Sequence, residues 1–133
     1  MNQIKKILQK NIHNLIKEKF NLEIPVFVIS YLELEDLLNN APSWWGTGNK
    51  QIYDNIIFIL SPVQSTEVKN VLGNLNENVE QIYEYKNCFF WSYELKNYRK
   101  SNWWVKTSST YIKDSITIKT ANTVKKLLEI CNK

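Results

Sequence analysis

The chain has little of the residues on which most recognisable active sites depend. Its 133 residues include one histidine, two cysteines, three glycines and three prolines. Metal centres and Ser-His or Cys-His nucleophile systems need clusters of histidine or cysteine, and His13, Cys88 and Cys131 form none in the sequence. We therefore expect no metal, no cofactor and no catalytic residue, and we interpret the protein as a non-enzymatic domain.

The same scarcities bound the class of protein. Few glycines and prolines argue against a flexible or low-complexity chain. The cysteines lack a CxxC partner and sit among apolar neighbours, which indicates free thiols in a reducing cytoplasm. No apolar run approaches membrane length, and charges interrupt the first 20 residues every few positions. We expect a cytoplasmic protein that does not bind membranes.

What is present predicts one α+β domain over residues 1–133, with a leading helix over 1–22 and a sheet with helices over 23–133. Apolar residues recur at helical spacing in residues 3–20, and β-branched or aromatic runs predict about five strands in a mixed sheet. These strands are expected at residues 24–30, 55–61, 79–85, 87–93 and 115–120.

Local signals sharpen this assignment. Ser30 followed by Glu33 is a capping box that opens a helix over 31–40. Ser65 is expected to cap a helix through Leu72. A short connection at 86–87 predicts a hairpin, and Thr120 or Asn122 is expected to cap the final helix.

Several of these pieces resemble a known family. The segments are IPVFVISYLELEDLLNNAP, PSWWG, IIFILSP and the closing ITIKTANTVKKLLEI. Their order is similar to the C-terminal part of the domain of unknown function 1697 family of bacterial proteins, over roughly residues 3–133. The resemblance implies the fold class and a bacterial origin, and it implies no particular reaction.

The chain also departs from that family. Members usually begin with a glycine-rich strand-turn segment and a further α+β half, which this sequence does not show. Residues 119–121 are Lys-Thr-Ala where the family often has an Arg-Asn-aromatic step. The resemblance implies a short member, or one lacking an N-terminal half, and any activity of that half should be missing here.

The leading functional hypothesis concerns the charge of residues 96–126. This segment holds seven lysines, one arginine and one acid, whereas residues 1–94 are net acidic. Interleaved aromatic residues are typical of surfaces that stack on unpaired bases while cations neutralise phosphates. We expect a nucleic acid or an acidic protein to bind at Tyr98, Arg99, Lys100, Trp103, Trp104 and Lys106.

Two alternatives stay open. The loop over 41–53 precedes a buried strand, where clefts often open, so a small-molecule or enzymatic site is possible at Trp44, Trp45, Gly46 and Asp54. Its GTGNK stretch lacks the spacing of a phosphate loop. A self-associating domain is the other alternative, because an uncovered sheet edge or apolar face would favour a homodimer. In each adjacent tryptophan pair we expect at least one ring to be partly exposed.

Overall fold

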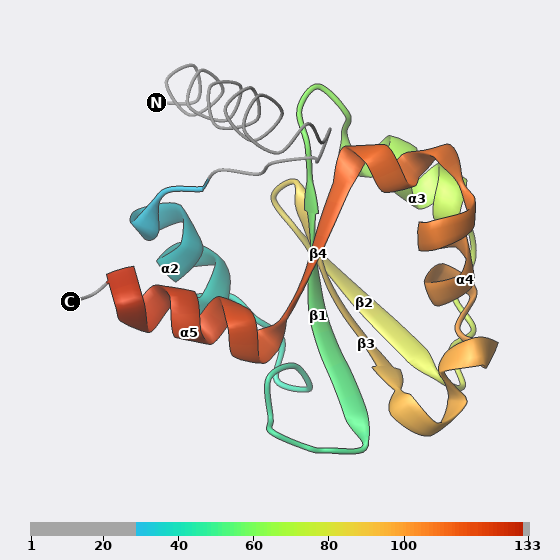
Figure 1. The fold of residues 1–133 in the computed structure, drawn as a ribbon, viewed down its shortest axis with the longest axis horizontal. Helices are drawn as coiled ribbons and strands as arrows, with labels where there is room; N and C mark the ends of the chain where they lie inside the picture. Colours follow the sequence, from blue (N-terminus) through green and yellow to red (C-terminus); the bar gives the residue numbers. More distant parts are fainter. Residues whose placement is uncertain (1–28, 132–133) are drawn as a thin grey trace, which may run out of the picture.

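Four strands form one antiparallel sheet at the centre of the molecule (Figure 1). A computed structural model describes residues 29–131. The strands lie in the order β2-β3-β1-β4, and every pairing among them is antiparallel. They are β1 (Ile52–Ile59), β2 (Glu80–Tyr85), β3 (Cys88–Glu94) and β4 (Ile116–Thr120).

The predicted α+β class is confirmed, and two details of the sheet are corrected. The described sheet has four strands rather than about five, and it is antiparallel rather than mixed. The fifth predicted strand, 24–30, lies mostly outside the described residues, and its last two residues are not in a strand. The predicted leading helix over 1–22, and His13 with it, also falls outside them.

Helices cover both faces of this sheet (Figure 1). On one face lie α2 (Tyr31–Asn39) and α5 (Ala121–Cys131). The other face is covered by α3 (Ser65–Leu72), α4 (Asn102–Ser109) and the short 3-10 helix η2 (Tyr111–Ser115), while a second 3-10 helix, η1 (Leu95–Lys100), links β3 to α4. The result is three layers with the sheet in the middle.

Strand periodicity explains why there are two cores. Successive side chains of a strand point to opposite faces. In β1, Ile57 and Ile59 contact the α3 and α4 layer, whereas Ile56 and Phe58 contact the α2 and α5 layer. All four side chains are buried, so the apolar run of β1 suits a central strand.

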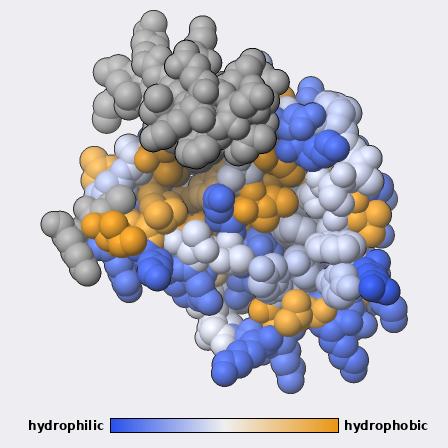
Figure 2. Space-filling view, viewed as in Figure 1, coloured by the Kyte–Doolittle hydropathy of each residue, from blue (hydrophilic) through white to orange (hydrophobic). Residues whose placement is uncertain are grey.

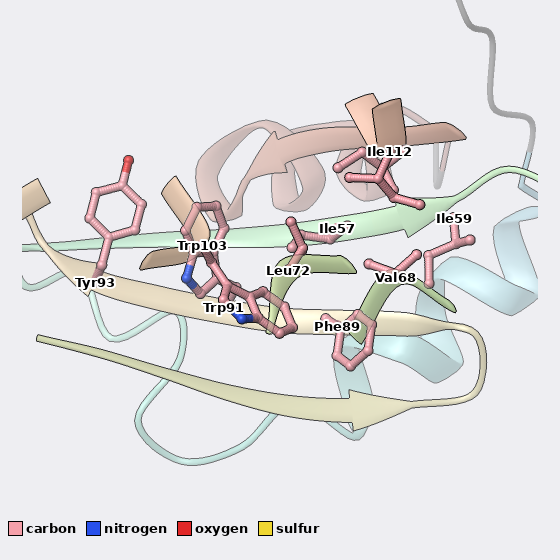
Figure 3. Close-up of a cluster of buried hydrophobic side chains, with 10 residues drawn as sticks. Ile57, Ile59, Val68, Leu72, Phe89, Trp91, Tyr93, Trp103 and Ile112 are labelled. Atoms are coloured by element: carbon pink, nitrogen blue, oxygen red, sulfur yellow. The ribbon is translucent and has the colours of Figure 1, made fainter. Parts of the chain in front are cut away.

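The core beneath α3 and α4 is rich in large rings (Figure 3). Trp103 of α4 lies against two rings of β3, with centroids 5.3 Å from Phe89 and 6.5 Å from Trp91. Burial of such rings removes much apolar area from water and stabilises the fold. The buried members of this cluster are Ile57, Ile59, Val68, Leu72, Phe89, Trp91, Tyr93, Trp103, Ile112 and Ile116.

Most of the predicted local signals are confirmed. The Ser30 hydroxyl accepts from the Glu33 amide at 3.2 Å, and the Glu33 carboxylate accepts from the Ser30 amide at 3.4 Å. Thr120 caps α5, since its Oγ1 accepts from the amide of Thr123 at 3.3 Å. At α3 the cap is Gln64, one residue before the predicted Ser65.

The β2–β3 hairpin turns where the sequence predicts it. Lys86 has φ 46°, in the left-handed region that such two-residue turns require. Among residues 29–131, none of the helices combines the length and the apolar character that crossing a membrane would require.

Candidate functional site

A basic and aromatic cluster lies where η1 meets α4. The ring of Tyr98 contacts the indole of Trp104 edge to face, with centroids 4.8 Å apart. Arg99 donates from Nε to the Tyr98 hydroxyl at 3.0 Å, and its guanidinium lies 5.5 Å from the centre of the Tyr98 ring. Trp104 is 37% exposed, and both Arg99 and Lys100 are exposed.

The start of α4 is held firmly, which fixes the position of Trp104. The Ser101 hydroxyl accepts from the Trp104 amide at 3.0 Å and donates to the Glu80 carboxylate at 2.7 Å. The same carboxylate accepts from the Asn102 amide at 2.8 Å and from the Trp91 indole at 3.1 Å. Negative charge at a helix N-terminus is stabilising, so buried Glu80 anchors α4 to β2 and β3.

Two of the six predicted residues of this cluster lie elsewhere. Trp103 is fully buried, and its indole donates to the Gly73 carbonyl at 2.9 Å (Figure 3). Lys106 lies on the flank of α4 that faces α3, because its Nζ is 3.0 Å from where a Cβ of residue 73 would be. Neighbouring helical residues are about 100° apart, so Trp103 and Trp104 cannot share one environment.

We call Tyr98, Arg99, Lys100 and Trp104 the basic-aromatic surface. Residues 96–126 contain a single acidic residue, Asp114. Within residues 29–131, no ion pair engages Arg99 or Lys100, and the ion pair found there joins Lys86 to Asp36 on the hairpin and α2. The positive charge of this surface is therefore not compensated by the described side chains.

The second predicted site, the Trp44–Trp45 loop, is closely packed. Trp45 is 6% exposed, donates from its indole to the Asn55 carbonyl at 2.8 Å and contacts Phe90 edge to face at 5.0 Å. Trp44 is half-buried against the α2 and α5 core. As predicted, one ring of each tryptophan pair is buried and its neighbour is partly exposed.

Asp54 lies at the centre of this loop's hydrogen bonds. Its carboxylate accepts from the Ser92 hydroxyl at 2.5 Å and from the Gly46 amide at 3.1 Å. Lys125 of α5 donates to the Gly46 carbonyl at 2.6 Å, with its ammonium 5.9 Å from the Trp45 ring centre. The structure thus brings three of the four predicted residues together, and their polar groups bond to one another or to the fold.

Two surface hollows adjoin the end of the sheet from which η1 leaves. The larger, of about 600 Å³, is lined by Lys50, Gln51, Ile52, Glu94, Leu95 and Lys96. The smaller, of about 180 Å³, lies on the β2 side and shares Ile52 and Glu94 with the first. Within the described residues no three metal-ligating side chains gather in one place.

Two further sites have perturbed acidities. The pKa of Asp36 is lowered, mainly by a hydrogen bond from Lys86 at 2.8 Å and secondly by one from the Tyr85 hydroxyl at 2.9 Å. The same bonds to Asp36 raise the pKa values of Lys86 and Tyr85. Burial raises the pKa of Tyr93 to about 12. Neither group belongs to the basic-aromatic surface.

Comparison with known proteins decides the family. Residues 2–90 match the family described as "Protein of unknown function (DUF1697)". The chain belongs to the DUF1697 family. This confirms the resemblance seen in the sequence, although the matched range ends before the predicted family tail at 116–130.

Structural comparison finds a similar fold over nearly the whole chain. The fold is similar to that of "conserved bacterial protein SP0830 from Streptococcus pneumoniae", with a TM-score of 0.79 and 20% sequence identity. The match covers 97% of this chain and 71% of that one. At this identity it shows a shared fold. A search among curated proteins finds no match.

Sequence reasoning missed two features of the site. Lys50 and Lys96 are 46 positions apart, and the pairing of Ile52 with Glu94 brings them to one hollow. Glu80 gives no signal in the sequence, since a glutamate opening a strand is usually solvated. A covariation between positions 80 and 101 is the kind of signal that would have found it.

Proposed function

We propose that this protein is a non-enzymatic binding domain whose basic-aromatic surface takes an anionic partner. The observation that carries the proposal is the arrangement of Arg99, which is bonded to the Tyr98 hydroxyl beside the exposed Trp104. A guanidinium held over an aromatic ring is pre-organised, so less side-chain freedom is lost on binding. The cytoplasmic setting predicted from the sequence is part of this proposal.

The charge of the surrounding segment supports the same function. Residues 96–126 carry seven lysines, one arginine and one aspartate, against a net charge of +4 for the whole chain. A concentration of one sign raises the local density of oppositely charged ligands and speeds their association. Figure 2 shows hydrophilic side chains over most of the lower edge of the molecule, near η1.

The buried carboxylates favour binding over catalysis. Both oxygens of Asp54 accept hydrogen bonds from Ser92 and Gly46, and Glu80 accepts four, from Asn76, Trp91, Ser101 and Asn102. A carboxylate that works as a general acid or base must reach a substrate proton. The bonds of these two groups instead join strands to loops and to α4.

The test is a titration of intrinsic tryptophan fluorescence with oligothymidylate and with poly-aspartate, at about 50 mM and about 200 mM salt. We expect quenching or a shift with at least one polyanion that weakens steeply as salt rises. Arg99→Gln should weaken this binding. Lys119→Gln is the matched control, because Lys119 pairs with Ile56 and so shares the opposite face of the sheet.

Two results would overturn the proposal. One is the absence of any polyanion binding at the lower salt concentration. The other is an equal loss of affinity in Arg99→Gln and Lys119→Gln, because the loss would then reflect net charge rather than this surface.

A further inference from the structure

The larger hollow lies at the start of η1, whereas Trp104 follows the end of η1 in α4. Its lining includes Leu95 and Lys96, the first two residues of η1, together with Lys50 from the loop before β1. The Leu95 amide donates to the Gln51 carbonyl at 3.0 Å, which fastens the two walls to each other. The hollow and the basic-aromatic surface are thus connected by η1, which is kinked at Asn97.

The distance between them suits a small number of ligand units. η1 is kinked at Asn97 (φ −114°, ψ 27°), between Lys96 and Lys100. A chain extends at most about 3.6 Å per residue, so the backbone positions of these two lysines are no more than about 14 Å apart. An extended ligand that contacts Trp104 would reach the hollow within a few monomers. Cations would then face it at both ends, from Arg99 and Lys100 at one and from Lys50 and Lys96 at the other.

Charge favours this hollow over its neighbour for an anionic ligand. Lys50 and Lys96 are exposed, and no described side chain forms an ion pair with either. The acid in the same lining, Glu94, accepts from the Asn97 side chain at 2.6 Å. The smaller hollow holds Glu77, Glu80 and Glu94 without any lysine, so it would repel phosphates.

We infer that the partner is a single-stranded nucleic acid that runs along η1 from the basic-aromatic surface into the larger hollow. This inference rests on the proposed function and names its ligand. Trp104 stacks on an unpaired base, Arg99 and Lys100 contact the adjoining phosphates, and Lys50 with Lys96 contact phosphates at the hollow. Stacking on aromatic side chains tolerates any base, so binding has little sequence preference.

The exposed ring distinguishes this ligand from other anions. Each nucleotide carries one phosphate and one flat aromatic base, which match the exposed cations Arg99 and Lys100 and the nearby ring of Trp104. An acidic peptide has the charge without the flat face, and a duplex keeps its base faces inside the stack. Trp104, 37% exposed beside uncompensated cations, therefore favours an unpaired strand.

The experiment compares oligothymidylate, a duplex of equal length and poly-aspartate by fluorescence anisotropy across a salt series. We expect the single strand to bind most tightly. Trp104→Ala should weaken it by about tenfold to a hundredfold. Lys50→Gln and Lys96→Gln should each lower the slope of log K against log salt by about 0.7 to 1, as expected when one phosphate contact is lost.

Control variants separate this track from general electrostatics. Glu77→Gln raises the positive charge by one in the acidic hollow and should not weaken binding, and Lys119→Gln should leave the salt slope nearly unchanged. Equal or tighter binding of the duplex or of poly-aspartate would overturn the inference while the anionic-partner proposal stands. Wild-type slopes in both Lys50→Gln and Lys96→Gln would overturn it as well. Absence of all binding would overturn both.

Discussion

The two tryptophan pairs of this protein have the same local pattern and very different surroundings. In each pair one indole is buried, at Trp45 and at Trp103, while its neighbour is partly exposed. Around Trp45 the nearby charged groups are bonded, Asp54 to Ser92 and Gly46 and Lys125 to Gly46. Around Trp104, Arg99 is bonded to the Tyr98 hydroxyl, but neither Arg99 nor Lys100 has an acidic partner in the described residues.

This difference teaches how to separate an aromatic residue that closes a core from one that offers a surface. A ring alone does not decide, because both pairs contribute to packing. What decides is whether an acid of the fold accompanies the neighbouring cation, as Asp54 accompanies Lys125 at Gly46. By this criterion the Trp44–Trp45 loop is a closed structural unit, and the basic-aromatic surface is the place to look for a partner.

The largest expected effect on stability comes from substituting Trp103, and Trp104 is substituted separately for comparison. Trp103→Ala should lower the free energy of unfolding by about 3–5 kcal/mol, because it leaves a cavity against Phe89 and Trp91. Trp104→Ala should cost about 1 kcal/mol, the order of one ring contact. Urea denaturation followed by circular dichroism measures both, and equal losses would contradict the assignment of the two rings.

The sequence predicted the elements better than their arrangement. The capping box at Ser30 and the turn at Lys86 are local, since a few neighbouring residues determine them. Among the described strands the sheet is antiparallel rather than mixed, a difference that local patterns do not predict because strand direction depends on pairings between distant segments, such as β1 with β4. No local pattern separates Trp103 from Trp104 either, since the packing of α4 against β3 decides which ring is buried.

The next largest loss of stability is expected from substituting Asp54, beside the Trp44–Trp45 pair. Asp54→Ala leaves the Ser92 hydroxyl and the Gly46 amide without their acceptor, so the free energy of unfolding should fall by about 1–3 kcal/mol. Thermal unfolding of Asp54→Ala, Ser92→Ala and the double variant would separate the pair energy from the single losses. A more stable Asp54→Ala would contradict the structural role and return this carboxylate to the candidate site residues.

Substitution of Lys125 should destabilise the same loop by a smaller amount. Lys125→Met keeps most of the aliphatic chain and removes both the bond to the Gly46 carbonyl and the cation near Trp45. We expect a loss of about 0.5–1 kcal/mol and easier quenching of tryptophan fluorescence by acrylamide. Lys126→Met, at an exposed neighbouring position, is the control, and identical quenching in the two variants would show that Lys125 does not close the loop.

The smallest expected effect concerns the exposed ion pair of Asp36 and Lys86. It adds to the comparison a cation that has an acidic partner at the surface. The hydrogen bond from Lys86 holds the pKa of Asp36 below its ordinary 3.8. A lowered folded-state pKa contributes stability above the unfolded-state value, and this contribution is lost as the pH falls through the folded-state pKa. Lys86→Gln should therefore raise the Asp36 pKa in an NMR titration and weaken the fall in stability at acidic pH.

Lys69→Gln, on α3 across the sheet, should leave the Asp36 pKa unchanged. If Lys86→Gln also leaves it unchanged, the bond from the Tyr85 hydroxyl is sufficient to hold the carboxylate, and the bond from Lys86 is not what lowers the Asp36 pKa.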